Sequence, residues 1–302
     1  MARNNLPQSG TCGVLALPGA RLAYQVTGHG PAVLMVHGFG LDLRMWNAQA
    51  EYLAPRYQVI RYDCRGFGSS GPFDPAAAYT HAGDLIALLD HLGIQQAALA
   101  GLSFGGRVAI EAALAAPQRV SGLALLDAVL DGVPWDHESQ VAIELAGHQA
   151  RNRGLLAGRE AWLAHPLFTP AHRSPEVADQ LAAMVAGYPG QHWIGHDPHE
   201  CPRVRPIDAL ENLCLPALVM VGEHDVPGFR EMSAVLARRI PGARYHIVAG
   251  AGHMITMERP AEVSQELGQF LGDISEFRHH RAAPPRPDHL QLRTPRTDRR
   301  QR

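Results

Sequence analysis

The sequence predicts an α/β fold, in which a mostly parallel β-sheet is flanked by helices. Short apolar runs of strand length alternate with amphipathic stretches of helix length, which is typical of strand–helix–strand units with right-handed crossovers. Most of the strand-like runs are apolar throughout, as expected of strands that are buried on both faces. Glycine and polar residues follow the ends of these runs, where open parallel sheets hold their active sites.

The composition is that of a globular protein with a sizeable core. The 302 residues are 46% hydrophobic, which is enough for one large domain or two modest ones. All 27 basic residues are arginine and the formal net charge is −2. Because the last residues combine proline with clustered arginine, we expect residues 278–302 to be a disordered basic tail. The acidic remainder is not typical of a nucleic-acid-binding protein.

Cysteine spacing and hydropathy predict a cytoplasmic protein. The four cysteines are irregularly spaced and do not suggest a disulfide framework. No stretch approaches the roughly 20 apolar residues of a membrane span, so no membrane partner is expected. Residues 1–12 are polar, are expected to be flexible, and lack the pattern of a signal peptide.

The beginning of the chain predicts a hairpin and a buried strand. Pro18-Gly19 separates two short apolar runs, which indicates an opening β-hairpin. The three predicted strands are Val14–Leu17, Leu22–Val26 and Ala32–Val36. The third ends in the glycine-rich loop His37–Gly40, where the N–H of Phe39 is a candidate to meet a developing oxyanion. We expect His37 itself to tie this loop down through hydrogen bonds.

The next segment predicts scaffold. A helix is expected over Trp46–Leu53 and a strand over Gln58–Tyr62, and the strand runs into the loop Asp63–Ser70. We interpret this loop as braced by its charged residues, with Cys64 as a packing residue. Thr80 is the expected N-cap of a leucine-faced helix that ends at Gly93.

The stretch Gly101-Leu102-Ser103-Phe104-Gly105 fits the pattern G-x-S-x-G of a nucleophile turn. It lies between a predicted strand, Ala97–Ala100, and a predicted helix, Arg107–Ala116. Such a turn strains the serine backbone and needs glycines where a β-carbon would collide. The alternative is an ordinary glycine-rich loop with a surface serine.

Residues 128–205 interrupt the strand–helix rhythm and are predicted to form a helical cap. Ser174-Pro175 is a helix start, and the segment is rich in aromatic residues. Those expected to bind substrate are Trp135, Trp162, Phe168 and Trp193. The alternative is a set of structural helices without substrate contact.

Two further patterns in the cap are given a structural interpretation. The prolines around His192, His196, His199 and Cys201 break any long helix, so we expect no metal site there. The arginines are expected on solvated faces, although any of them would suit a carboxylate. They are Arg151, Arg153, Arg159, Arg173, Arg203 and Arg205.

The parallel pattern resumes after the cap. Predicted elements are the strand Ala217–Val221, the helix Arg230–Ile240, the strand Tyr245–Val248 and the helix Ala261–Leu271. The core domain is therefore assigned to residues 13–127 and 206–275, on either side of the cap.

Three residues that follow separate predicted strands form a candidate triad. A serine hydroxyl needs a base to become a nucleophile, and His253 fits that role for Ser103. The imidazole needs an orienting carboxylate, for which Asp225 is preferred because its strand immediately precedes the one that delivers His253. Asp127 also follows a strand, Val120–Leu126, and is the rival for the acid role.

These motifs together resemble the α/β-hydrolase superfamily, in the capped group of bacterial esterases and enol-lactone hydrolases. The resemblance covers about Val14 to Leu271 and implies an eight-stranded sheet with a cap after the sixth strand. It also implies an oxyanion hole formed by the N–H groups of Phe39 and Phe104. The stretch from Leu43 through Asp90 and the serine turn is similar to 3-oxoadipate enol-lactonases, which implies a small acidic lactone.

We therefore expect hydrolysis of a small-molecule ester or lactone through an acyl-enzyme, without metal or organic cofactor. Superfamily members with aspartate or cysteine in place of Ser103, or with an essential lysine, do not match this chain. The alternatives are a carbon–carbon hydrolase of ring-cleavage products, a cofactor-free perhydrolase or haloperoxidase, and a non-catalytic ligand receptor. The sequence leaves the oligomeric state open.

Overall fold

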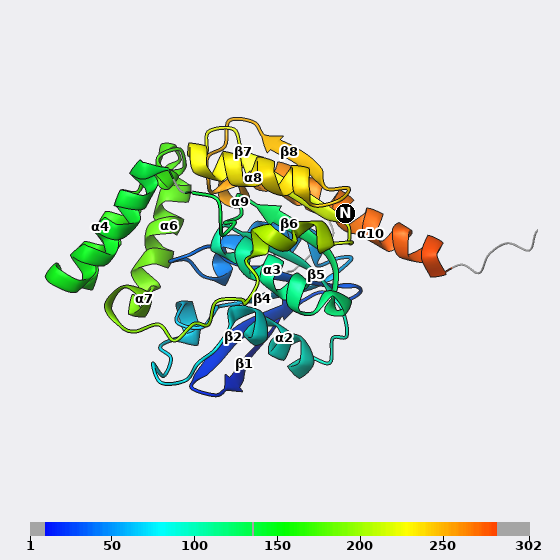
Figure 1. Cartoon of the computed structure of the whole chain (residues 1–302), viewed down its shortest axis with the longest axis horizontal. Coiled ribbons are helices and arrows are strands. Elements are labelled where there is room, and N and C mark those ends of the chain that lie inside the picture. Colours follow the sequence, from blue (N-terminus) through cyan, green and yellow to red (C-terminus); the bar gives the residue numbers. More distant parts are fainter. Residues whose placement is uncertain (1–9, 135, 283–302) are drawn as a thin grey trace, which may run out of the picture.

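The backbone is organised around one eight-stranded sheet in the order β1-β2-β4-β3-β5-β6-β7-β8 (Figure 1). This is a computed structural model that describes residues 10–134 and 136–282. β2 is antiparallel to both of its neighbours, and every pairing from β4 to β8 is parallel. The strands are β1 Thr11–Leu17, β2 Ala20–Thr27, β3 Ala32–Val36, β4 Gln58–Tyr62, β5 Ala97–Leu102, β6 Val120–Leu126, β7 Ala217–Gly222 and β8 Arg244–Val248. The predicted mostly parallel sheet and opening hairpin are confirmed.

Burial along the strands follows their place in the sheet. All residues of the central strands β5 and β7 are buried, as expected of strands covered by helices on both faces. β8 lies at the edge and alternates between exposed and partly buried residues. The carboxyl ends of β5, β6, β7 and β8 therefore lie side by side at one edge of a buried, apolar core.

Helices flank this sheet and form the segment between β6 and β7. The α-helices are α1 Asn47–Leu53, α2 His81–His91, α3 Phe104–Ala115, α4 His137–Arg153, α5 Leu155–Leu163, α6 Pro175–Gly187, α7 Gln191–Ile194, α8 Pro227–Arg239, α9 Ile255–Glu258 and α10 Pro260–Ala282. The 3-10 turns are η1 Leu43–Trp46, η2 Gly68–Ser70, η3 Pro117–Arg119, η4 Pro166–Phe168, η5 Ala171–Arg173 and η6 Pro206–Asn212. The predicted helix Trp46–Leu53 is therefore α1 together with the end of η1.

The predicted helix starts are confirmed by their caps. The Thr80 hydroxyl accepts a hydrogen bond from the Gly83 N–H, 2.9 Å away. Ser174 caps α6 through the N–H of Val177. Each cap satisfies one of the N–H groups that a helix start leaves without an intrahelical partner.

Both ends of the described chain are more ordered than the sequence suggested. Thr11 and Cys12, expected in the flexible segment 1–12, pair with Val26 and Gln25 of β2. α10 continues to Ala282 and so includes five residues of the predicted tail 278–302, since the next helix breaker is Pro284. Residues 1–9 and 283–302 lie outside the described part of the chain.

The cap segment, residues 128–205, holds α4 to α7. In Figure 1, α4, α6 and α7 gather at one side of the molecule, and the end of α10 projects from the opposite side. A bridge between Tyr79 and His199 links the cap segment to the chain before α2. Among the described residues, no helix has the length and apolar character needed to cross a membrane.

Candidate active site

Ser103 occupies a strained turn between β5 and α3. Its backbone has φ 56° and ψ −117°, a conformation that a residue with a side chain adopts only under constraint. A β-carbon at Gly101 or Gly105 would lie closer than 3.0 Å to backbone atoms of Gly105 or Val36. The sharp turn therefore requires both glycines, and Ser103 is not part of an ordinary surface loop.

His253 is held by Asp225 beyond the ends of β8 and β7. The Nδ1 of His253 lies 2.8 Å from the Oδ2 of Asp225, and both side chains are buried. The Oδ1 of Asp225 accepts a second bond from the N–H of Val226 at 2.7 Å. The ring of Phe229 packs against the imidazole with centroids 4.3 Å apart. This arrangement fixes the orientation of the histidine ring.

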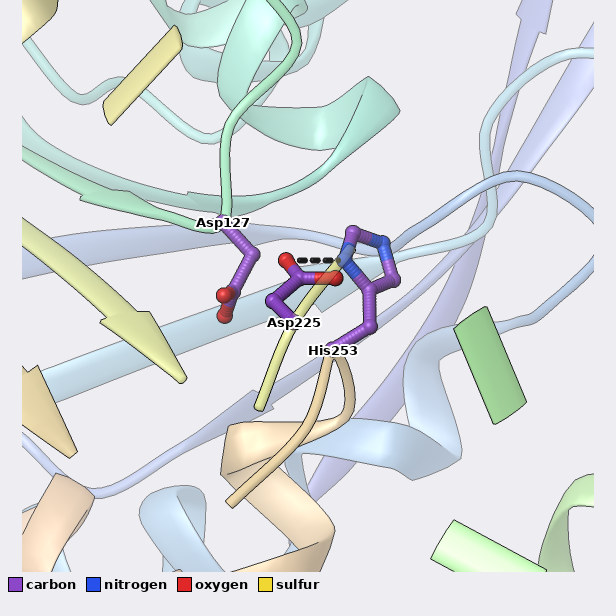
Figure 2. A group of neighbouring side chains, drawn as sticks. All are labelled: Asp127, Asp225 and His253. Carbon is purple, nitrogen blue, oxygen red and sulfur yellow. Dashed lines mark hydrogen bonds and ion pairs between the residues drawn. The ribbon is translucent and has the colours of Figure 1, made fainter. Parts of the chain in front are cut away.

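The rival carboxylate, Asp127, lies next to this pair. One carboxylate oxygen each of Asp127 and Asp225 and one ring nitrogen of His253 lie within 4.8 Å of one another. Figure 2 shows the carboxylate of Asp225 between the other two side chains, with its hydrogen bond to His253. Asp127 instead accepts the N–H of Gly222 at 2.8 Å. Asp225, and not Asp127, therefore accepts the hydrogen bond of His253.

Ser103 and His253 line one narrow crevice, together with Phe39, Trp162 and Phe168. Ser103 also lines an adjoining cavity of about 390 Å³, within the range of small-molecule sites. A larger cavity of about 560 Å³ between α1, α6 and α9 contains neither Ser103 nor His253. The chemistry therefore points to the smaller cavity.

Phe39 lines both the crevice and the adjoining cavity, and Phe104 lines the cavity. Phe104 is the first residue of α3, where the N–H has no intrahelical acceptor. Among the described residues, neither amide has a recorded acceptor. Both residues therefore lie near Ser103 with amides that are available to an oxyanion, and the oxyanion hole itself stays a prediction.

The loop that carries Phe39 is tied down by His37, as expected. The Nδ1–H of His37 donates to the Gly38 carbonyl at 2.8 Å, and its Nε2 accepts the Cys64 N–H at 2.9 Å. Burial lowers the pKa of His37, which keeps Nε2 unprotonated as this acceptor role requires. Cys64 is fully buried, which confirms it as a packing residue.

The loop after β4 is braced, but by partners that the sequence did not single out. The carboxylate of Asp63 accepts the N–H groups of Leu43 and Ser69 at 2.8 and 2.7 Å. Arg65 forms a buried ion pair with Asp84 on α2, 2.8 Å apart, instead of pairing within the loop. The scaffold role of the loop is confirmed.

Three of the four residues predicted to bind substrate line the cavities at Ser103. Trp162 lines both the narrow crevice and the cavity of about 390 Å³. Phe168 lines the crevice, and Trp193 lines the cavity. Trp135 lies outside the described residues. Substrate contact itself stays a prediction for all four.

Sequence reasoning missed a cluster of rings beneath the cap segment. The ring cluster consists of Phe39, Phe67, Phe104, Tyr188 and His192. Phe67 stacks on His192 with centroids 4.4 Å apart and on Tyr188 at 5.1 Å. Phe39 and Phe104 pack against the same phenyl ring at 5.4 and 5.5 Å. The residues with free amides are thereby joined through their side chains to the cap.

Burial favours the neutral form of the histidines near this cluster. Burial lowers the pKa of His192 to about 4 and that of His81 well below its ordinary value. His81 and His192 both line the cavity at Ser103. The sequence grouped His192 with His196, His199 and Cys201, but His196 and Cys201 are exposed, and the ring of His199 stacks on His81 with centroids 5.1 Å apart.

Two cap arginines hold the cap together instead of only facing solvent. Arg151 donates to the carbonyl of Trp193 at 2.8 Å, and Arg159 donates to that of Tyr188 at 3.1 Å. The exposed positions of Arg153, Arg173, Arg203 and Arg205 agree with the prediction. An arginine that we did not predict, Arg107 on α3, lines the cavity, and its signal was its place four residues after Ser103.

Comparison with known proteins agrees with this geometry. A family model described as alpha/beta hydrolase fold matches residues 31–260. The RutD protein of Azorhizobium caulinodans, whose name gives carbamate hydrolase as its activity, is 32% identical over 85% of this chain and 97% of its own. A thermophilic esterase of Thermogutta terrifontis with malate bound is 32% identical, with a TM-score of 0.74 over 88% of this chain and 99% of its own. The enol-lactonase of Burkholderia xenovorans LB400 is 27% identical, with a TM-score of 0.71 over 86% of this chain and 100% of its own.

Proposed function

Because this chain belongs to the alpha/beta hydrolase fold family, which includes esterases and lactonases, we propose that it hydrolyses a carboxylic ester or lactone through an acyl-enzyme on Ser103. One observation carries the proposal. Ser103, on a strained turn, shares a crevice with His253, whose other side is held by a buried carboxylate. A nucleophile, a base and a group that orients the base are the parts that acyl transfer needs.

In the first half of the reaction, the Oγ of Ser103 attacks the carbonyl carbon of the substrate. The Nε2 of His253 takes the hydroxyl proton as the C–O bond forms. Asp225 accepts the Nδ1–H and stabilises the imidazolium through their 2.8 Å contact. The imidazolium then returns the proton to the leaving alkoxide, which departs as an alcohol and leaves the acyl group on Ser103.

The negative charge on the carbonyl oxygen is the second requirement. The amides of Phe39 and Phe104 are proposed to donate to this oxyanion, because both residues line the cavity at Ser103 and neither amide has an acceptor among the described residues. Preorganised donors in a dry site stabilise developing charge without reorganisation, and loss of one such donor costs about 10²-fold or more in rate.

In the second half, His253 removes a proton from water, and the resulting hydroxide attacks the acyl carbon. Collapse of the second tetrahedral intermediate breaks the acyl–Oγ bond and returns the proton to Ser103. The products are a carboxylic acid and the free enzyme, and the reaction needs no oxidant or reductant.

The walls of the cavity favour a compact, largely apolar substrate. Its volume of about 390 Å³ is bounded by apolar groups that include Val129, Ile143, Leu167 and Trp193. The lining also includes the charged residues Arg107, Asp131 and Asp197. All four cysteines are free thiols, and we propose a cytoplasmic location on that basis.

Hydrolysis of p-nitrophenyl esters from acetyl to decanoyl tests the proposal. We expect turnover by the wild type and a loss of at least about 10⁴-fold in Ser103→Ala, because the nucleophile is removed. Ser69→Ala, at an exposed serine, is the matched control and retains activity. The acyl-length optimum reports the depth of the cavity.

The same assay with other substrates separates the alternatives. A lactone and an aryl carbamate are run in parallel, since relatives carry these activities in their names. Turnover of a vinylogous diketone without ester turnover indicates a carbon–carbon hydrolase, and peroxide-dependent halogenation in acetate indicates a perhydrolase. A folded wild type that turns over none of these, but binds a ligand, refutes the proposal in favour of a receptor.

A further inference from the structure

Asp127 holds a constrained position between the ends of β6 and β7. Its φ of 42° is one of only two positive values among the described non-glycine residues, the other belonging to Ser103. The N–H of Asp127 donates to the carbonyl of Met220, and its Oδ1 accepts the N–H of Gly222, both at 2.8 Å. Strain that is retained in this way points to a role for the side chain.

One oxygen of this carboxyl group has no donor. Asp127 is fully buried, and its Oδ2 has no hydrogen-bond partner among the described residues. The neighbouring side chain is that of Asp225, which carries only acceptor oxygens when ionised (Figure 2). A buried acceptor without a donor is costly, so the arrangement calls for a proton between the two groups.

In the described part of the chain, the titratable groups that face Asp127 carry no permanent positive charge. The titratable groups that face Asp127 are Asp225 after β7, Glu258 on α9, Tyr245 on β8 and His253 in the loop after β8. No arginine is among the main influences that described residues have on the ionisation of Asp127, and the chain contains no lysine. Two buried carboxyl groups this close cannot both be ionised.

The hydrogen bonds indicate which group keeps the proton. Asp225 accepts two N–H donors, from Val226 and His253, whereas Asp127 accepts only the N–H of Gly222. A carboxylate that accepts more donors is the more stable anion. The proton therefore belongs on the Oδ2 of Asp127.

We propose that Asp127 is a neutral carboxylic acid that donates a hydrogen bond from Oδ2 to the carboxylate of Asp225, as a positioning residue for the triad. This rests on the proposed function of Ser103, His253 and Asp225. The donated bond gives the buried anion a third donor, holds it against His253, and limits the basicity that Asp225 imparts to the ring.

The ionisation of Asp127 agrees with this geometry. Burial raises the pKa of Asp127 well above its ordinary value, and the charge of Asp225 and a hydrogen bond shared with Asp225 add to the effect. Asp208, which pairs with Arg205 at the surface, is a suitable control position.

Infrared spectroscopy detects the proton directly. We expect the wild-type minus Asp127→Asn difference spectrum at pH 7 to contain the C=O stretch of a protonated carboxyl group, which shifts in D₂O. Other protonated carboxyl groups cancel in this difference, and the wild-type minus Asp208→Asn spectrum lacks the band. The absence of the band in the first difference overturns the inference.

The pH profile of kcat/KM separates positioning from structural support. Asp127→Asn keeps an N–H donor towards Asp225, so we expect kcat within about threefold of wild type and an unchanged acid limb. Asp127→Ala removes the donor, which lowers kcat and moves the acid limb to higher pH. A structural residue would lower Tm in Asp127→Ala without moving the limb.

An ionised Asp127 would behave differently. Removing its charge in Asp127→Asn would move the acid limb to lower pH by about one to three units, as expected for a carboxylate so close to the base. That result overturns the inference. If the wild type hydrolyses no ester, the proposed function fails, whereas the infrared band still reports the proton on Asp127.

Discussion

The two sides of the cavity at Ser103 are built on different principles. At the strand ends, Ser103, Asp225 and His253 are fixed by strained backbone and short hydrogen bonds. In the ring cluster, Phe67 and Tyr188 are held mainly by stacking, and the Nε2 of His192 has no partner among the described residues. At the strand ends, single side-chain atoms are held in place, whereas in the ring cluster the faces of whole rings are held against one another.

The two sides also respond to pH in opposite directions. Burial raises the pKa of the carboxyl groups of Asp127, which follows β6, and of Glu111 on α3. Around the ring cluster, burial lowers the pKa of His81, His192 and His199. Both shifts favour the neutral form of a buried group. Stability is consequently limited by alkali on one side and by acid on the other.

The largest expected contrast is kinetic. Asp225→Asn should reduce kcat for p-nitrophenyl butyrate by about 10⁴-fold, because the amide favours the wrong tautomer of His253. Tm should change little, since the asparagine has the same shape. The control is Asp208→Asn at the surface. A reduction of less than tenfold would contradict the role of Asp225 and would favour Asp127 as the functional acid.

Sequence reasoning reached the strand ends because each residue there is tied to a local pattern. Ser103 is marked by flanking glycines, and Asp225 and His253 follow apolar runs whose parallel pairing brings their ends together. Even the choice between Asp225 and Asp127 followed from strand order and agrees with the hydrogen bond to His253.

The ring cluster could not be predicted in this way. Phe67 and His192 are more than a hundred residues apart and stack only because the cap segment folds back over the loop after β4. Neither residue stands in a periodic pattern, and Phe67 was included only in a loop interpreted as scaffold. The protonation of Asp127 was hidden for the same reason, since it depends on a neighbour from another strand.

The next largest effect tests whether the ring cluster supports the cap. Phe67→Ala removes a fully buried ring that contacts rings on both sides of the cap boundary. We expect the free energy of unfolding to fall by about 3–5 kcal/mol, measured by urea titration. Leu156→Ala, at a side chain that is 69% exposed on α5, should change it by no more than about 0.5 kcal/mol. Equal effects would show that the cluster carries no special share of stability.

Glu111 on α3 tests the alkaline limit. Burial raises its pKa from 4.5 to about 7, although Arg107 opposes the shift. Between these values the native state binds more protons than the unfolded state, so the free energy of unfolding falls as pH rises through that window. Glu111→Gln has no ionisable group at this position and therefore lacks this loss. We expect the free energy of unfolding of Glu111→Gln minus that of wild type to increase by about 2–3 kcal/mol from pH 5 to pH 8. Parallel denaturation profiles over this range would be inconsistent with a buried, neutral Glu111.

His192 tests the acid limit on the side of the ring cluster. Burial lowers its pKa from 6.5 to about 4, so between these values the unfolded state binds more protons than the native state. The free energy of unfolding therefore falls as pH decreases through that window, by about 2 kcal/mol between pH 7 and pH 5. His192→Gln should remove this part of the acid loss, and the exposed His196→Gln is the control. If wild type and His192→Gln lose stability in parallel, the ring is already hydrated in the native state, and the cap would be held by its backbone contacts instead of by the stacked rings.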